Sequence, residues 1–146
     1  MGETLIPLPE RVFRHPFRVR YSEVDCQGVA YNAHYLTWFD VALWEFFRSL
    51  PWDLKAQVRD TGTDFHTVKA VVDYHAPVRF DEEIRVAVQP VRIGGSSLTF
   101  SLSLDVAGED RRRASGEIVW VNACQTTHTS RPLPDGLRNR LAPLLP

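Results

Sequence analysis

The spacing of apolar residues changes along the chain and divides it into a helical part and a strand-rich part. In the first third, up to Leu50, apolar residues fall on nearly every side of a helix, a pattern typical of a buried helix. Asn32 is a plausible N-cap for this helix, and Pro51 predicts its end after Leu50. Residues 52–63 then predict a short irregular helix that closes at Gly62.

Apolar and polar residues alternate from residue 65 onward, as in a strand with one buried face. Strands are predicted over residues 65–75, 83–91, 98–106 and 113–122, with hairpin turns at 94–95 and 108–110 and an earlier short strand over 17–21. Residues 1–15 are expected to form an extended N-terminal arm, and residues 126–146 a tail with a short helix.

This order of elements, one strand, a long apolar helix and four strands joined largely by hairpins, predicts the α+β class. We expect one domain over residues 1–146, in which an antiparallel sheet carries the principal helix on one face. One five-stranded sheet hardly covers a helix that is apolar on nearly every side. Pairing of two subunits is therefore expected.

Composition narrows the class of protein without naming a function. The apolar fraction of 44% and the charged fraction of 24% are those of an ordinary globular protein. The net charge of −1 gives no support to a nucleic-acid-binding or membrane-binding surface, and no apolar run is long enough to span a bilayer. The two cysteines, Cys26 and Cys124, do not make a disulfide scaffold, so we expect a cytoplasmic protein.

A lone aspartate, Asp25, occupies the polar turn between the first strand and the long helix. The N–H groups of a helix's first turn lack partners within the helix, so this terminus can hold a developing oxyanion. A carboxylate beside it can act as a general base toward water or attack a carbonyl itself. Gly28 permits a close approach of the backbone to a ligand, or a positive φ. From the residues alone, a turn-forming or capping role is the commoner explanation for Asp25.

The run RVRYSEVDCQGVAYNAHYLTWFD, residues 18–40, resembles the signature of the 4-hydroxybenzoyl-CoA thioesterase family, which includes acyl-CoA thioesterases of the YbgC/FadM type. Residues 72–86, 94–104 and 114–121 resemble later parts of the family pattern in the same order, so the resemblance covers most of the chain from about residue 15. It implies a hotdog fold, in which a curved antiparallel sheet wraps around a long central helix. It also implies hydrolysis of an acyl-CoA to a free acid and coenzyme A.

The resemblance also assigns roles to individual residues. Asp25 takes the place of the catalytic aspartate, and the backbone N–H near Asn32 would polarise the thioester carbonyl. Gly28 belongs to the same motif. Four further residues match positions that shape the site or contact the pantetheine arm: Tyr21, Tyr31, Ser96 and Ser97. No cofactor is implied, since coenzyme A is part of the substrate, and a homodimer or homotetramer is expected.

Two residues depart from the family pattern. A histidine is frequent in the YbgC branch where this chain has Asn32, whereas here His34 lies two positions further on. His34 is a candidate to orient water or substrate. The alternative is that His34 only caps the helix or faces solvent. Glu23 stands where the family has the first acidic residue of its Asp-x-Asp motif.

Two other functions are the alternatives to thioester hydrolysis. A non-catalytic acyl-CoA or acyl-carrier binding protein would need Asp25 only for structure. An enoyl-thioester hydratase would need an Asp-x-Asn-x-x-His arrangement, which Asp25-Cys26-Gln27 does not match. The Arg111–Arg113 run is either a contact for the 3′-phosphate of coenzyme A or a solvated hairpin edge. The histidine spacings do not predict a metal site.

Overall fold

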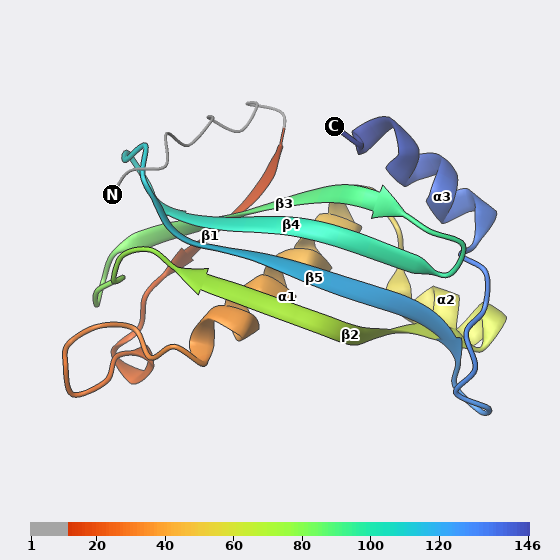
Figure 1. The fold of residues 1–146 in the computed structure, drawn as a ribbon, viewed down its shortest axis with the longest axis horizontal. Coiled ribbons are helices and arrows are strands. Elements are labelled where there is room, and N and C mark those ends of the chain that lie inside the picture. Colours follow the sequence, from red (N-terminus) through yellow and green to blue (C-terminus); the bar gives the residue numbers. More distant parts are fainter. Residues whose placement is uncertain (1–11) are drawn as a thin grey trace.

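The computed structural model describes residues 12–146, and its centre is one curved sheet of five antiparallel strands (Figure 1). The strands are β1 (Phe13–Arg18), β2 (Thr63–Tyr74), β3 (Glu83–Ile93), β4 (Ser97–Val106) and β5 (Arg112–Cys124), in the spatial order β1-β3-β4-β5-β2. The helices are α1 (His34–Ser49), α2 (Leu54–Thr61) and α3 (Asp135–Leu141), with short 3₁₀ turns at Tyr21–Glu23 and Ala142–Leu144. The predicted α+β class is confirmed.

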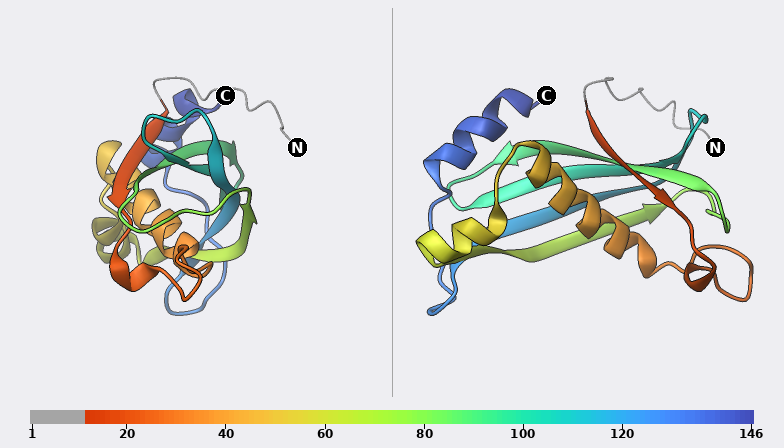
Figure 2. Two further views of the ribbon diagram at one scale, coloured as in Figure 1. Left: turned by 90° about the vertical axis from the view of Figure 1, so that its left-hand side faces the viewer. Right: turned by 180° about the vertical axis from the view of Figure 1, so that it is seen from behind.

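Helix α1 lies diagonally across the concave face of the sheet (Figure 2). Its buried residues recur every three or four positions and are Tyr35, Trp38, Phe39, Ala42, Leu43, Phe46 and Phe47. The predicted alternation in β3 and β4 supplies the facing layer, because Ile84, Leu102 and Leu104 are fully buried. The hydrophobic core is thus the space between α1 and the sheet.

Phe39 brings α1 unusually close to β5. Its ring is fully buried, and a Cβ built on Gly116 would lie 2.5 Å from Phe39 Cε2 and 2.5 Å from the carbonyl oxygen of Val71. Carbon atoms in van der Waals contact lie about 3.5–4 Å apart. The helix therefore rests on bare backbone at Gly116, and this contact sets how deeply α1 sits in the sheet.

The first strand differs from the prediction at both ends. It was expected over residues 17–21, but β1 runs from Phe13 to Arg18 and pairs with β3, so the last residues of the predicted arm belong to the sheet. Residues 1–11 of that arm lie outside the described residues. Pro16 is tolerated within β1 because β1 is an edge strand. The chain then curls into a 3₁₀ turn, since the N–H of Glu23 donates to the carbonyl of Arg20 at 2.9 Å.

The start of α1 also differs from the prediction, because Asn32 is not its N-cap. The helix begins at His34, and the preceding Ala33, already in helical geometry, makes no side-chain cap. The entry is closed by backbone bonds, in which the N–H of His34 donates to the carbonyl of Tyr31 at 3.0 Å. The end of α1 is as predicted, with Leu50 as its C-cap before Pro51.

The later elements agree with the prediction to within a few residues. Helix α2 is the predicted short helix, capped by the carboxylate of Asp53 and closed at Gly62. Helix α3 is the predicted helix of the tail. A bulge between Thr67 and Lys69 interrupts the predicted alternation of β2 and leaves Val68 59% exposed.

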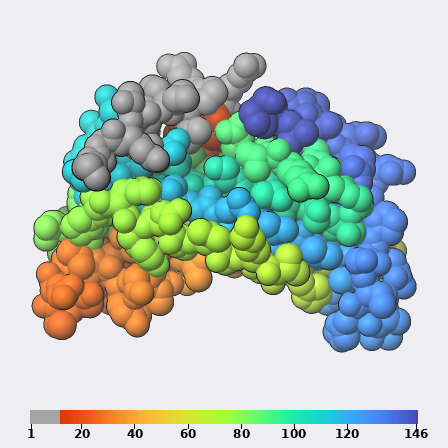
Figure 3. Space-filling view, viewed as in Figure 1, coloured from red at the N-terminus to blue at the C-terminus, as the bar shows by residue number. Residues whose placement is uncertain are grey.

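Strand β2 is the second edge of the sheet, and its outer side has no partner strand among residues 12–146. Its residues lie at the surface of the molecule (Figure 3). Val68, Val71 and Tyr74 are all exposed along it. On the helix, Leu36 and Val41 are 43% and 38% exposed. The single chain therefore leaves part of the apolar surface of α1 and the edge of β2 uncovered. No helix within the described residues is long and apolar enough to cross a membrane.

Candidate active site

Asp25 is held in a tight turn that closes on its own backbone. Val24 and Ala30 form an isolated antiparallel bridge, and the N–H of Asp25 donates to the carbonyl of Val29 at 2.9 Å. The N–H of Gly28 donates to the carbonyl of Asp25 at 2.9 Å, and Gly28 has φ +77°, which disfavours any residue with a side chain. The expected turn geometry at Gly28 is confirmed.

One carboxylate oxygen of Asp25 belongs to the turn and the other is available. Oδ1 accepts the backbone N–H of Gln27 at 2.8 Å. Within residues 12–146, Oδ2 has no hydrogen-bond or ion-pair partner, and the residue is only partly buried. The turn therefore orients the carboxylate while it leaves one oxygen free to react.

The turn is fastened to the sheet by the segment that precedes β3. The N–H of Ala30 donates to the carbonyl of Val78 at 2.7 Å, and Val29 pairs with Arg79 in an isolated bridge. The same segment is held to β5 by Arg113, whose guanidinium donates to the carbonyl of Pro77 at 2.6 Å. The position of Asp25 thus depends on the segment before β3 and on β5, as well as on its own turn.

Glu23, two residues before Asp25, is a buried structural carboxylate. It is 4% exposed, and it accepts the N–H of Arg20 at 2.8 Å and the indole N–H of Trp38 at 2.9 Å. Burial acts to raise the pKa of Glu23, but the hydrogen bonds from Arg20 and Trp38 outweigh it and hold the pKa below its ordinary value. Sequence reasoning treated Glu23 only as a family acidic position and missed this role.

The start of α1 presents two backbone donors near this turn. Within the described residues, the N–H groups of Asn32 and Ala33 donate to no protein acceptor. The next two N–H groups do: His34 donates to the carbonyl of Tyr31, and Tyr35 to that of Asn32. Two adjacent free N–H groups at the positive end of a helix are suited to bind an oxyanion.

The other candidate residues divide into two groups. Tyr21 and Tyr31 flank the Asp25 turn and are 80% and 52% exposed, and His34 is the first residue of α1, with its ring 5.9 Å from that of Tyr31. No hydrogen bond or ion pair among residues 12–146 joins His34 to Asp25. Ser96 and Ser97 lie at the turn between β3 and β4, at the opposite end of the sheet (Figure 1). A single chain does not bring these serines to Asp25.

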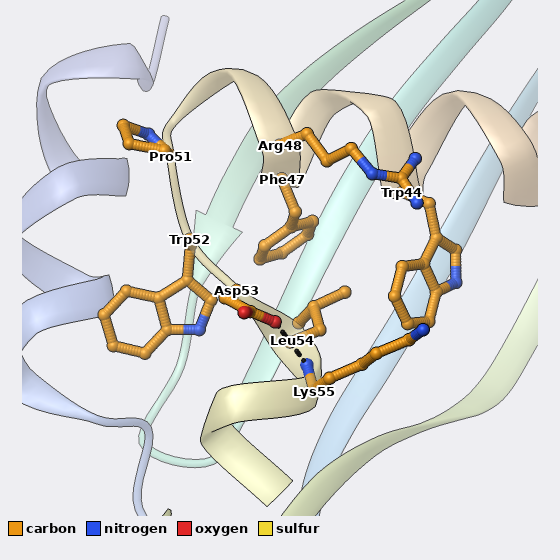
Figure 4. Close-up of a pocket in the computed structure, with 8 residues that line it drawn as sticks. All are labelled: Trp44, Phe47, Arg48, Pro51, Trp52, Asp53, Leu54 and Lys55. Atoms are coloured by element: carbon orange, nitrogen blue, oxygen red, sulfur yellow. Dashed lines mark hydrogen bonds between the residues drawn. The ribbon is translucent and has the colours of Figure 1, made fainter.

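A hollow of about 340 Å³ opens at the C-terminal end of α1 (Figure 4). Its lining combines aromatic rings with two cations: Trp44, Phe47, Arg48, Pro51, Trp52, Asp53, Leu54 and Lys55. Arg48 and Lys55 extend toward the side of the hollow where Trp44 lies. Because 16 helical residues span about 24 Å, this hollow is far from the Asp25 turn of the same chain.

Comparison with known proteins identifies the family of this chain. Residues 19–141 match the model of the thioesterase-like superfamily. The chain belongs to this superfamily. An acyl-CoA thioester hydrolase of Escherichia coli, YbgC, is 28% identical over 126 residues, which is 86% of this chain and 92% of the relative.

Two solved structures resemble the fold of this chain. A protein from Pseudomonas aeruginosa has 27% identity and a TM-score of 0.82, over 95% of this chain and 96% of its own. A Staphylococcus aureus protein, whose structure was determined in complex with CoA, has 17% identity and a TM-score of 0.84, over 99% of this chain and 90% of its own. The hotdog fold expected from the sequence is confirmed.

The three arginines of the run at the β4–β5 turn differ in burial and in hydrogen-bond partners. Arg113 is largely buried and bonds Glu109 at 2.7 Å, as well as Pro77, so it acts as an internal clamp. Arg111 is exposed and Arg112 is partly buried. Only these two keep the role of candidate contacts for a phosphate group.

Proposed function

We propose that the protein is an acyl-CoA thioester hydrolase that releases a free carboxylic acid and coenzyme A. One observation carries this proposal. Asp25, which has one carboxylate oxygen without a hydrogen bond, precedes a buried helix whose start presents the unbonded N–H groups of Asn32 and Ala33. Membership of the thioesterase-like superfamily and the likeness to YbgC support the same reaction.

In this proposal the thioester carbonyl lies against the N–H groups of Asn32 and Ala33. These donors stabilise the negative charge that develops on the carbonyl oxygen as a nucleophile attacks the carbon. The free oxygen of Asp25 either removes a proton from the attacking water or attacks the carbon itself. The C–S bond then breaks, and the coenzyme A thiolate takes up a proton. Where Asp25 is the nucleophile, this step leaves a mixed anhydride on Asp25, and water hydrolyses it to release the acid and restore the carboxylate. The bond from Gln27 keeps the carboxylate turned toward the substrate.

We further propose that the working unit is at least a homodimer formed along β2. The unpaired edge of β2 and the exposed Leu36 and Val41 on α1 supply a surface for a second copy. If two copies pair antiparallel about a two-fold axis, the Tyr74 end of one β2 lies beside the Thr63 end of the other. Helix α2 leads directly into that Thr63 end.

Such pairing explains why the candidate residues are far apart within one chain. Ser96, Ser97 and the hollow beside α2 lie at the Thr63 end of the sheet, whereas Asp25 and Asn32 lie at the Tyr74 end (Figure 1). Across the interface, the hollow of one subunit faces the carboxylate of the other. Its aromatic walls suit an acyl group, and Arg48 and Lys55 suit the anionic part of coenzyme A. We place this reaction in the cytoplasm, with Cys26 and Cys124 as thiols.

A thiol-reagent assay tests the proposed reaction. Purified protein is incubated with butyryl-CoA, decanoyl-CoA and benzoyl-CoA, and the release of coenzyme A is followed; at least one should be turned over. Asp25→Asn should reduce kcat at least about 100-fold, the usual contribution of a positioned general base, while the melting temperature stays the same. Binding of all three without release would assign an acyl-CoA binding protein instead. Loss of the double bond of crotonyl-CoA without release would assign a hydratase.

A further inference from the structure

Tyr74, the last residue of β2, reaches across to the start of α1. Its phenol donates a hydrogen bond of 2.8 Å to the backbone carbonyl of Asn32, 42 residues away in the chain. The ring is held edge-on against Tyr35, with centroids 4.9 Å apart and an interplanar angle of 83°. The other donor to the same carbonyl, the N–H of Tyr35, lies 3.4 Å away. The phenol is therefore the closer partner of this carbonyl.

The carbonyl of Asn32 belongs to the same peptide unit as the N–H of Ala33. The described chain has no cis peptide bond, and in a trans peptide the C=O and N–H groups point in opposite directions. A hydrogen bond that holds the carbonyl toward Tyr74 therefore aims the N–H of Ala33 away from β2. It also polarises the peptide, and such coupling strengthens a neighbouring hydrogen bond by roughly 10–30%.

We infer that Tyr74 is a positioning residue for thioester hydrolysis: its hydroxyl orients the Asn32–Ala33 peptide so that the N–H of Ala33 is presented to the thioester oxygen. The inference rests on the proposed function. Tyr74 acts through this peptide and does not itself touch the reacting atoms. Although its ring is half exposed, partial desolvation of the phenol raises the pKa of Tyr74 above its ordinary value, so the phenol keeps the proton that it donates.

The variant Tyr74→Phe tests this role because it keeps the ring and its packing against Tyr35 and removes only the hydroxyl. With whichever of butyryl-CoA, decanoyl-CoA and benzoyl-CoA the unmodified protein hydrolyses fastest, kcat should fall roughly 5- to 20-fold. This is less than the roughly 100- to 1,000-fold loss that follows removal of an oxyanion donor itself. KM, the melting temperature and the oligomeric state should not change.

Infrared spectroscopy supplies a readout that a purely structural role would not move. The same acyl-CoA, labelled with ¹³C at the carbonyl, is bound to Asp25→Asn, in which turnover is suppressed. The carbonyl stretch should shift to lower frequency on binding, because donors polarise the C=O bond, and the shift should be smaller in Asp25→Asn/Tyr74→Phe. An unchanged frequency would overturn the inference, whatever happens to kcat.

The kinetic outcomes separate this inference from the function on which it rests. If the unmodified protein releases no coenzyme A from any of the three substrates, the proposed function and this inference fail together. If release depends on Asp25 and is unaffected by Tyr74→Phe, only the inference fails. A fall in kcat that comes with a matching fall in melting temperature assigns Tyr74 to stability and also overturns it.

Discussion

The indole N–H of Trp38 donates to the carboxylate of Glu23 across 2.9 Å, and this bond joins the second turn of α1 to the loop that carries Asp25. Glu23 in turn accepts the N–H of Arg20, and its own carbonyl accepts the N–H of Tyr31 at 2.8 Å. One buried carboxylate therefore ties together the residues on both sides of the Asp25 turn. The position of the reactive carboxylate depends on an acidic residue that takes no part in the proposed chemistry.

This arrangement predicts that Glu23 stabilises the fold in a pH-dependent way. Its pKa is held below the ordinary value of 4.5, so its ionic contribution is complete above pH 4.5 and is lost as the pH falls through the lowered pKa. Glu23→Ala leaves the Trp38 indole and the Arg20 N–H without their acceptor. We expect it to lower the free energy of unfolding by about 2–3 kcal/mol near pH 7, as measured by urea unfolding.

The matched control is Glu45→Ala, which removes a carboxylate that pairs with Arg48 at the surface of α1. Such i,i+3 pairs contribute about 0.5 kcal/mol or less, so this variant should be nearly neutral. The difference in free energy of unfolding between Glu23→Ala and the unmodified protein should also become smaller as the pH falls below 4.5. A Glu23→Ala variant as stable as Glu45→Ala would contradict the buried role.

The contact between Phe39 and Gly116 predicts a steric limit on β5. Gly116→Ala places a methyl group 2.5 Å from the Phe39 ring and from the backbone oxygen of Val71, so the helix must move outward. Overpacking of a core in this way costs about 1–3 kcal/mol, which should appear as a lower melting temperature in calorimetry. The control is Gly95→Ala, where a Cβ would meet no atom within 4 Å. Equal melting temperatures for the two variants would rule out a tight contact.

The thiol of Cys124 should react as a thiolate near neutral pH. Hydrogen bonds from the side chain and backbone of Thr127, and from the backbone of Thr126, lower its pKa from 9.0 to about 7. In a Cys26→Ser background, the rate of alkylation by iodoacetamide, followed by mass spectrometry, should reach half its maximum near pH 7. Adding Thr127→Val should move this midpoint upward. A midpoint near 9.0 in the single variant would show that these bonds do not stabilise the thiolate.

The proposed dimer predicts that charges on the uncovered edge separate the subunits. Val68→Asp on β2 with Val41→Asp on α1 places carboxylates on surfaces that pairing would bury, and buried unpaired charges are strongly unfavourable. Light scattering should show a monomer that hydrolyses acyl-CoA poorly although its Asp25 turn is intact. Val91→Asp, at an exposed valine of β3, is the control and should remain associated. A double variant that stays dimeric would place the interface elsewhere.

The parts of the fold that could be predicted are those set by neighbouring residues. Alternation in β3 and β4, the apolar helix, and the Asp25–Gly28 turn all depend on residues a few positions apart, and the sequence predicts each of them. The bonds from Trp38 to Glu23 and from Tyr74 to Asn32 join residues 15 and 42 positions apart. No local pattern marks such pairs, because they form only when the helix and the sheet pack.

The same reason accounts for the correction at Asn32 and for the separation of Ser96 and Ser97 from Asp25. Asn32 has the residue type of an N-cap. Backbone hydrogen bonds to the carbonyls of Tyr31 and Asn32 nevertheless close the start of α1, and the Asn32 side chain does not cap it. Ser96 and Ser97 match a substrate-binding segment of the family, yet the sheet holds them at the end opposite Asp25. In the proposed dimer, the second copy of the chain supplies these serines.

The turn from Val24 to Ala30 closes on its own backbone, so one short run of consecutive residues orients the reactive carboxylate. The hollow at the far end of α1 is built from other parts of the chain. In the proposed enzyme, bond cleavage and the choice of acyl group are therefore encoded separately. Substitutions around Trp44 and Leu54 can alter which acids are released while the hydrolytic step stays as it is, and a new substrate range needs no new chemistry.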